Sequence, residues 1–202
     1  MVKIFVEGIA DVVFLRQYVK HLYGVELDAD SIINVDGWEK IRNEEIITQL
    51  RHNSDDAGIN LVIFDADKDC EARRTELEKV AQDNGVAFDL FLFPNNADSG
   101  ELETLLMRII NPLNQPVAEC WDRYEDDLKK QTVPWKTPTT PTTPSIKTRV
   151  YAYLEALVGE SKSQKKLIKE AERKYDNQNH WNLDSSELES LKTFLDKYFV
   201  KP

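Results

Sequence analysis

A run of residues at 60–64, Asn-Leu-Val-Ile-Phe, places the strongest constraint on the fold of this chain. Apolar residues stand at consecutive positions in it, so both faces of a strand formed here must be covered, as in the centre of a parallel sheet. Such a sheet needs helices packed against its two faces. The run therefore favours an α/β fold.

Three further strand-like runs, at 2–6, 31–35 and 87–93, alternate with stretches that have helical spacing of apolar residues. Another helical pattern follows over 100–110. The connections are long enough for parallel pairing of the strands. We expect an α/β fold with a parallel sheet of about four strands and helices on both faces.

The second half of the chain has no strand pattern. Its apolar spacing predicts helices near 115–130, 146–158, 162–174 and 185–199, the last with Ser186 and Glu189 at capping-box spacing. The expected division is an α/β domain over 1–112, a helical connector over 113–130, a Pro/Thr-rich linker over 131–145 and a C-terminal helical subdomain over 146–202.

The Pro/Thr-rich linker carries Pro138, Pro141 and Pro144 at every third position. Polyproline II has three residues per turn, so these prolines would line one edge of an extended rod. A stiff surface linker is the favoured interpretation. A flap near the active site and a docking segment for another protein are the alternatives.

Acidic residues follow three of the predicted strands. They are Glu7 and Asp11 after the first strand, Asp65, Asp67 and Asp69 after the third, and Glu101 and Glu103 after the fourth. An acid-x-acid triplet alone should occur about six times by chance in a chain this acidic, so the placement carries the argument. Ligands of open α/β sheets bind at the carboxyl edge of the strands, where these acids should converge.

Crowded carboxylates need compensation. Two of them about 4 Å apart repel by roughly 4 kcal/mol at an effective dielectric near 20, against a total domain stability of about 5–15 kcal/mol. They must be protonated, splay apart or bind a cation. Oxygen ligands without His or Cys select Mg²⁺ or Mn²⁺ over Zn²⁺.

The formal net charge of -10 argues against a nucleic-acid coat protein or a basic membrane binder. Bound divalent cations would still let an acidic protein handle a phosphate backbone. The sequence has no apolar run long enough to span a bilayer and no signal peptide, and Cys70 and Cys120 are isolated. We therefore expect a cytoplasmic protein with free thiols and no membrane partner.

Two motifs carry a family resemblance. Val6-Glu7-Gly8-x-x-Asp11 and Phe64-Asp65-Ala66-Asp67 resemble the Toprim domain of topoisomerases, bacterial primases and overcoming-lysogenization-defect (OLD) nucleases. The closer likeness is to small stand-alone Toprim-like proteins of uncharacterised type, which share Phe93-Pro94-Asn95-Asn96 and Gly100-Glu101-Leu102-Glu103-x-x-Leu106. The likeness covers about residues 1–110.

The resemblance implies a role for each matching acid. Glu7 matches a glutamate that ligates metal or acts as general acid or base, and Asp65 and Asp67 match an aspartate pair that binds Mg²⁺. Asp69 would extend the metal site or cap the following helix. A plain strand-to-turn junction is the alternative for Glu7.

The OLD-like branch implies further residues. Asp11 matches an extra acid of that branch, and Glu101 or Glu103 its later acids. All three have an alternative role as favourable acids in the first turn of a helix. The branch also uses a downstream lysine, for which Lys147 is the candidate.

The leading hypothesis is an Mg²⁺- or Mn²⁺-dependent nuclease acting on DNA or RNA. Asp65 and Asp67 would hold one ion, Glu7 and Asp11 would complete that site or activate the nucleophile, and the later glutamates would help with a second ion. The alternative is a non-catalytic metal-binding module that partners an ATPase or another protein, with the Pro/Thr-rich segment as its docking element. Primase-like nucleotidyl transfer ranks third, because the acidic charge leaves little room for a template groove.

One basic stripe stands out in the second half. On a helix over 162–174, one face would carry Lys162, Lys165, Lys166, Lys169 and Arg173. It could grip a phosphate backbone. A solvated face paired with neighbouring glutamates is the favoured interpretation.

Overall fold

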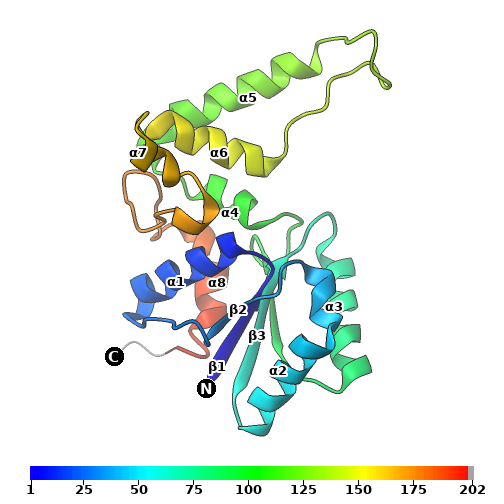
Figure 1. Cartoon of the computed structure of the whole chain (residues 1–202). Helices are drawn as coiled ribbons and strands as arrows, with labels where there is room; N and C mark the ends of the chain where they lie inside the picture. Colours follow the sequence, from blue (N-terminus) through cyan, green and yellow to red (C-terminus); the bar gives the residue numbers. More distant parts are fainter. Residues whose placement is uncertain (200–202) are drawn as a thin grey trace.

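The structure, a computed structural model, describes residues 1–199 and is built on a four-stranded sheet (Figure 1). All neighbouring strands pair in parallel, in the order β2-β1-β3-β4. The strands are β1 (Val2–Val6), β2 (Ile32–Asn34), β3 (Ile59–Asp65) and β4 (Asp89–Phe93). The expected α/β fold is therefore confirmed, and the apolar run at 60–64 lies in a central strand, as its composition predicts.

Helices α1 (Ile9–Tyr23) and α8 (Glu189–Leu195) cover one face of the sheet, as Figure 1 shows. Alternate strand residues such as Ile4 and Val6 point into this core. The ring of Phe194 on α8 lies 5.4 Å from that of Phe91 on β4. The last helix of the chain, α8, therefore packs back on the sheet and belongs to the same core as β1 and α1.

The opposite face is covered by α2 (Glu44–Asp55) and α3 (Cys70–Asn84), with the 3-10 helix η1 (Trp38–Arg42) beside them. Phe5, Val62 and Phe64 supply the strand side of this second core. Because both faces are covered, the inner strands are apolar at successive positions.

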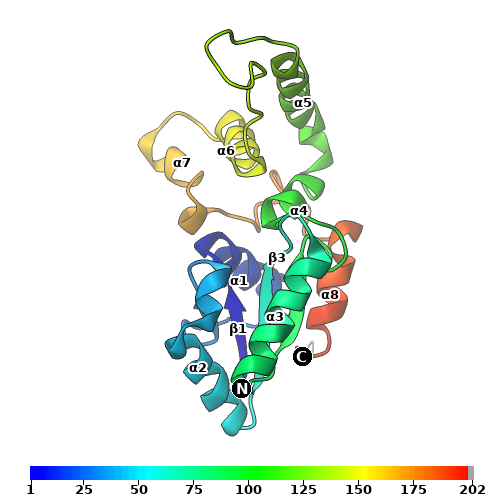
Figure 2. The ribbon, with the colours of Figure 1, turned by 90° about the vertical axis from the view of Figure 1, so that its right-hand side faces the viewer.

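A helical arm extends beyond the carboxyl ends of the strands (Figure 2). From α4 (Leu102–Arg108) and η2 (Pro112–Asn114) the chain enters α5 (Gln115–Lys129), turns back and returns as α6 (Ile146–Leu157). The Pro/Thr-rich segment forms the far tip of this arm. It is not a straight rod, because the Val133 N–H donates to the Thr139 carbonyl at 2.8 Å and closes a turn.

Two predicted helices are shorter than expected. In place of a helix over 162–174, the chain forms α7 (Lys162–Lys166) and η3 (Glu170–Glu172). In place of a helix over 185–199 it forms η4 (Ser186–Leu188) and then α8, and Ser185 rather than Ser186 supplies the cap.

Tertiary contacts explain the first break. Lys169 and Arg173 have extended backbones on either side of η3, and the carbonyl of Arg173 accepts a hydrogen bond from Gln17 of α1 at 2.9 Å. Arg173 is buried, so a single solvated basic face was a wrong prediction for this residue. Helical spacing in the sequence could not reveal this contact with α1.

No helix within residues 1–199 combines the length and the apolar character needed to cross a bilayer. Cys70 is buried on α3 and Cys120 is exposed on α5, and both are free thiols.

Candidate functional site

The loops after β1 and β3 meet at the carboxyl edge of the sheet. Glu7 directly follows β1, and its Oε1 accepts a hydrogen bond from the backbone N–H of Asp65, the last residue of β3, at 3.1 Å. The next N–H, that of Ala66, donates to the carbonyl of Phe93 at the end of β4 at 3.1 Å. Glu7 and Asp65, 58 positions apart in sequence, are therefore direct neighbours.

The start of α4 is hydrogen-bonded to the same carboxyl edge of the sheet. Oδ1 of Asp65 accepts a hydrogen bond from the Leu102 N–H at 2.8 Å. Asp67 and Gly100 exchange two backbone hydrogen bonds of 2.8 and 2.7 Å. Gly100 has a φ of 140°, a backbone conformation that disfavours residues with a Cβ. These contacts place Glu101 beside the loop that follows β3.

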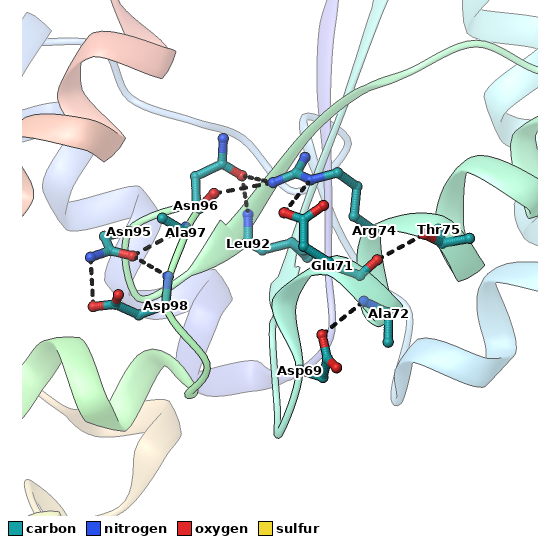
Figure 3. Close-up of polar contacts among 10 residues, drawn as sticks. All are labelled: Asp69, Glu71, Ala72, Arg74, Thr75, Leu92, Asn95, Asn96, Ala97 and Asp98. Carbon is teal, nitrogen blue, oxygen red and sulfur yellow. Dashed lines mark hydrogen bonds and ion pairs between the residues drawn. The ribbon is translucent and has the colours of Figure 1, made fainter.

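Asn95 and Asn96 shape the loop between β4 and α4, as Figure 3 shows. Asn96 Oδ1 accepts hydrogen bonds from the Leu92 N–H at 3.1 Å and from Arg74 of α3 at 2.9 Å. Asn95 Oδ1 accepts one from the Asp98 N–H at 2.8 Å. Asn95 and Asn96 therefore fix the conformation of the loop between β4 and α4.

Asp69 is the N-cap of α3. Its Oδ1 accepts a hydrogen bond from the Ala72 N–H at 3.0 Å (Figure 3), so the structure gives it the capping role considered from the sequence. It also borders a hollow of about 520 Å³ that Asp67 and Glu101 line. Asp69 thus caps α3 and adjoins two of the acids through this hollow.

Asp11 lies in the first turn of α1 and is only 5% exposed. Its Oδ2 accepts a hydrogen bond from the Gly8 N–H at 2.8 Å. Burial raises the pKa of this carboxyl to about 8, and the negative charges of Glu103 and Glu7 act in the same direction. Asp11 therefore lies among the other acids rather than serving only the helix terminus.

Burial also raises the pKa of the acids at the strand ends. The pKa of Asp65 is raised well above its usual range, first by burial and then by the charges of Asp11 and Glu7. The pKa of Glu7 is raised to about 7 by burial and by the charge of Asp67, against the lowering effect of the Asp65 N–H. Near neutral pH, Glu7 can therefore both take up and release a proton.

The two later glutamates complete this group. Glu103 is buried on α4, and its charge raises the pKa of Asp11 and Asp65. The pKa of Glu101 is raised by burial and by the charges of Glu103 and Asp67. We call the six mutually repelling residues the acidic cluster: Glu7, Asp11, Asp65, Asp67, Glu101 and Glu103.

Lys147, in the first turn of α6, lies within electrostatic range of the acidic cluster, although it is far from the other candidates in sequence. Its positive charge lowers the pKa of Asp11 and of Glu101. Its Nζ pairs with Oε1 of Glu170 at 2.8 Å. The structure therefore brings together the lysine and the acids that the sequence singled out.

Arg73 is a neighbour of the acidic cluster that sequence reasoning missed. It is buried on α3, pairs with Asp67, and lies 3.1 Å from Glu76. Its guanidinium carbon is 3.8 Å from the centre of the Trp38 ring. Asp67 thus has a counter-charge from the protein, which no motif in the sequence signalled.

The donor set of the acidic cluster consists only of carboxylate oxygens, the ligands that hard divalent cations prefer. Within residues 1–199, no three acidic, His or Cys side chains lie close enough together to hold an ion as they stand. Glu7, Asp11 and Asp65 each accept a hydrogen bond from a backbone N–H, and Asp67 is turned to Arg73. The donor chemistry of the cluster fits a hard cation, and its carboxylates would have to turn toward the ion to bind it.

Comparison with known proteins identifies one family. A family model described as "Protein of unknown function (DUF3226)" matches residues 1–200. No curated protein and no solved structure matches the chain. The four-stranded parallel sheet is consistent with a Toprim-like fold, whereas the matched family carries no Toprim description.

Proposed function

The chain belongs to the DUF3226 family, and we propose that it is a Toprim-like, Mg²⁺- or Mn²⁺-dependent enzyme that cleaves phosphodiester bonds of DNA or RNA. The observation that carries the proposal is the contact between Glu7 and the Asp65 N–H, which joins the two Toprim-like motifs at one edge of the sheet. The other members of the acidic cluster, Asp11, Asp67, Glu101 and Glu103, lie at the same edge.

Charge balance favours a cation at this edge. The positive charges near the six carboxylates are fewer than the carboxylates: Arg73 pairs with Asp67, Lys147 lowers the pKa of Asp11, and Lys68 lines the hollow. The pKa values of Glu7, Asp11, Asp65 and Glu101 are all raised. Raised pKa values mean that burial and mutual repulsion disfavour the ionised carboxylates. A divalent cation would offset the repulsion and let these carboxylates stay ionised near neutral pH.

Each residue has a role in this proposal. Asp65 and Asp67 would hold the ion, with Asp11 and Glu103 behind them. The ion would neutralise charge on the phosphate and make bound water more acidic. Glu7, with a pKa of about 7, is suited to accept a proton from the attacking water at neutral pH. Lys147 would face the phosphate with a positive charge.

We expect the purified full chain to cleave single-stranded DNA or RNA with Mn²⁺ or Mg²⁺ and to lose this activity in chelator. The assay should include Asp55→Asn as a control, because Asp55 is an exposed acid at the end of α2, before β3 begins. This control should cleave like the wild type. Ion binding without cleavage of either nucleic acid would contradict the enzymatic proposal and favour the interaction module. Absence of ion binding would contradict both.

A further inference from the structure

Arg173 is the most deeply buried charged residue in the described part of the chain, with 1% of its surface exposed. Its Nε donates to the Ile168 carbonyl at 3.1 Å. Within residues 1–199, neither Nη1 nor Nη2 has a hydrogen-bond partner. The guanidinium lies over the ring of Tyr151, whose centre is 4.7 Å from the guanidinium carbon. A buried guanidinium in this state is costly, because its unpaired N–H groups have lost their water.

Tyr175, two residues further along, is also buried, and its hydroxyl lies beside the Arg173 guanidinium, which lowers the pKa of the hydroxyl by charge and by side-chain hydrogen bonding. Within residues 1–199 the hydroxyl makes no hydrogen bond of good geometry. Burial raises the pKa of this hydroxyl, and Arg173 opposes the shift, whereas the charges of Glu103 and Asp11 add to it. Its ring packs edge-on against Phe14 at 5.4 Å, one helical turn beyond Asp11 on α1. Tyr175 therefore lies within electrostatic range of the acidic cluster.

The backbone around both residues is firmly held. Gln17 of α1 donates from Nε2 to the Arg173 carbonyl at 2.9 Å. Its Oε1 accepts from the N–H groups of Tyr175 at 2.6 Å and of Asp176 at 3.0 Å. One side chain thus fixes this segment to the helix that carries Asp11. Unpaired donors on a fixed backbone are suited to receive a ligand without rearrangement of the main chain.

Lys147 adds a second positive charge nearby. Oε1 of Glu170 pairs with Lys147 at 2.8 Å and accepts a hydrogen bond from the Tyr151 hydroxyl at 3.3 Å. Tyr151 in turn packs against Arg173. A carboxylate of the chain itself is therefore held among these basic and hydroxyl groups, which indicates that the neighbourhood accepts an anion.

We propose that Arg173 and Tyr175 form a phosphate-binding element beside the acidic cluster, which holds a non-bridging phosphate oxygen of the substrate. The planar guanidinium fork matches two phosphate oxygens, and the tyrosine hydroxyl supplies a third donor. The inference deepens the proposed function and rests on it for the identity of the substrate.

The test uses the full chain with Tyr175→Phe and Arg173→Lys. Tyr153→Phe is the matched control, because Tyr153 is also buried but its hydroxyl donates to the His180 carbonyl at 2.6 Å. Calorimetry in Mg²⁺ measures binding of inorganic phosphate, and steady-state cleavage of a short oligonucleotide gives KM and kcat. Thermal unfolding confirms that each variant is folded.

We expect Arg173→Lys to weaken phosphate binding or to raise KM by about tenfold or more. We expect Tyr175→Phe to change the same two quantities by about threefold to tenfold. The value of kcat should change less than KM, and Tyr153→Phe should bind like the wild type. If the variants raise KM for the oligonucleotide but leave binding of inorganic phosphate unchanged, the element binds a phosphodiester. If they weaken binding of inorganic phosphate to the same extent, it binds a free phosphate group. Unchanged binding in both assays with Tyr175→Phe, which keeps the buried ring, would overturn the inference.

Failure of the proposed function would be recognised separately. A wild type that neither binds Mn²⁺ nor cleaves nucleic acid would contradict the metal-dependent enzyme. Binding of inorganic phosphate in chelator, compared between the wild type and Tyr175→Phe, would then still decide whether the element exists.

Discussion

Replacing Asp65 with asparagine should lower the rate of metal-dependent cleavage by at least about 100-fold, because even groups that only orient a metal ligand contribute 10–100-fold. The fold should survive, because the asparagine oxygen can still accept the hydrogen bond from the Leu102 N–H. Removal of a buried charge near Asp11 and Glu7 should also leave the metal-free protein at least as stable as the wild type. The change therefore separates a loss of activity from a loss of folding.

The measurement compares initial cleavage rates of the wild type, Asp65→Asn and the control Asp55→Asn, together with thermal unfolding in chelator. A variant Asp65→Asn that cleaves at the rate of the wild type would remove Asp65 from the site. A variant that loses both activity and thermal stability would indicate a purely structural role.

Replacing Asp11 with asparagine should stabilise the metal-free protein at alkaline pH. The pKa of Asp11 in the folded chain is about 8, above its ordinary value of 3.8. The folded state therefore binds this proton more tightly than the unfolded state does. The resulting stabilisation is complete below about pH 3.8 and is lost as the pH rises through about 8.

The expected gain for Asp11→Asn is more than about 2 kcal/mol in the free energy of unfolding near pH 8.5, since one pKa unit corresponds to about 1.4 kcal/mol. Near pH 4 the variant should differ little from the wild type. The carboxyl is faced by Glu7 and Glu103, which raise its pKa, and by Lys147, which lowers it. Asparagine keeps an acceptor for the Gly8 N–H.

Urea unfolding in chelator at several pH values tests this prediction. Saturating Mg²⁺ or Mn²⁺ should stabilise the wild type most at high pH, because an ion that binds only the folded state adds to its stability. The variant should lose much of that response. A wild type whose stability rises between about pH 5 and pH 8.5 without metal would contradict the assignment of a destabilising buried carboxylate.

Much of the fold follows from local pattern. The apolar runs predict the positions of the strands, and the alternation with helices predicts a parallel sheet. The β3 run is apolar at successive positions because α1 and α8 cover one face and α2 and α3 the other. Parallel pairing then places Glu7 and Asp65 at one edge, so their proximity could be predicted without coordinates.

Other features depend on contacts that no local pattern records. Arg73 reaches Asp67 because α3 turns that face toward Trp38. The helix expected over 162–174 ends at Lys166, and Gln17 holds the backbone of Arg173 and Tyr175 against α1. Spacing alone placed Arg173 on a solvated face, and only the fold reveals that it is buried against Tyr151 and held to α1.

The most direct test of the central claim is the location of Mn²⁺ in crystals of the full chain. We expect an anomalous scattering peak at roughly 2.1 Å from carboxylate oxygens of Asp65 and at least one other member of the acidic cluster. We also expect Asp67 to turn away from Arg73. Crystals with saturating Mn²⁺ that show no peak at the carboxyl edge of β1 and β3, or a peak only elsewhere on the surface, would contradict the claim.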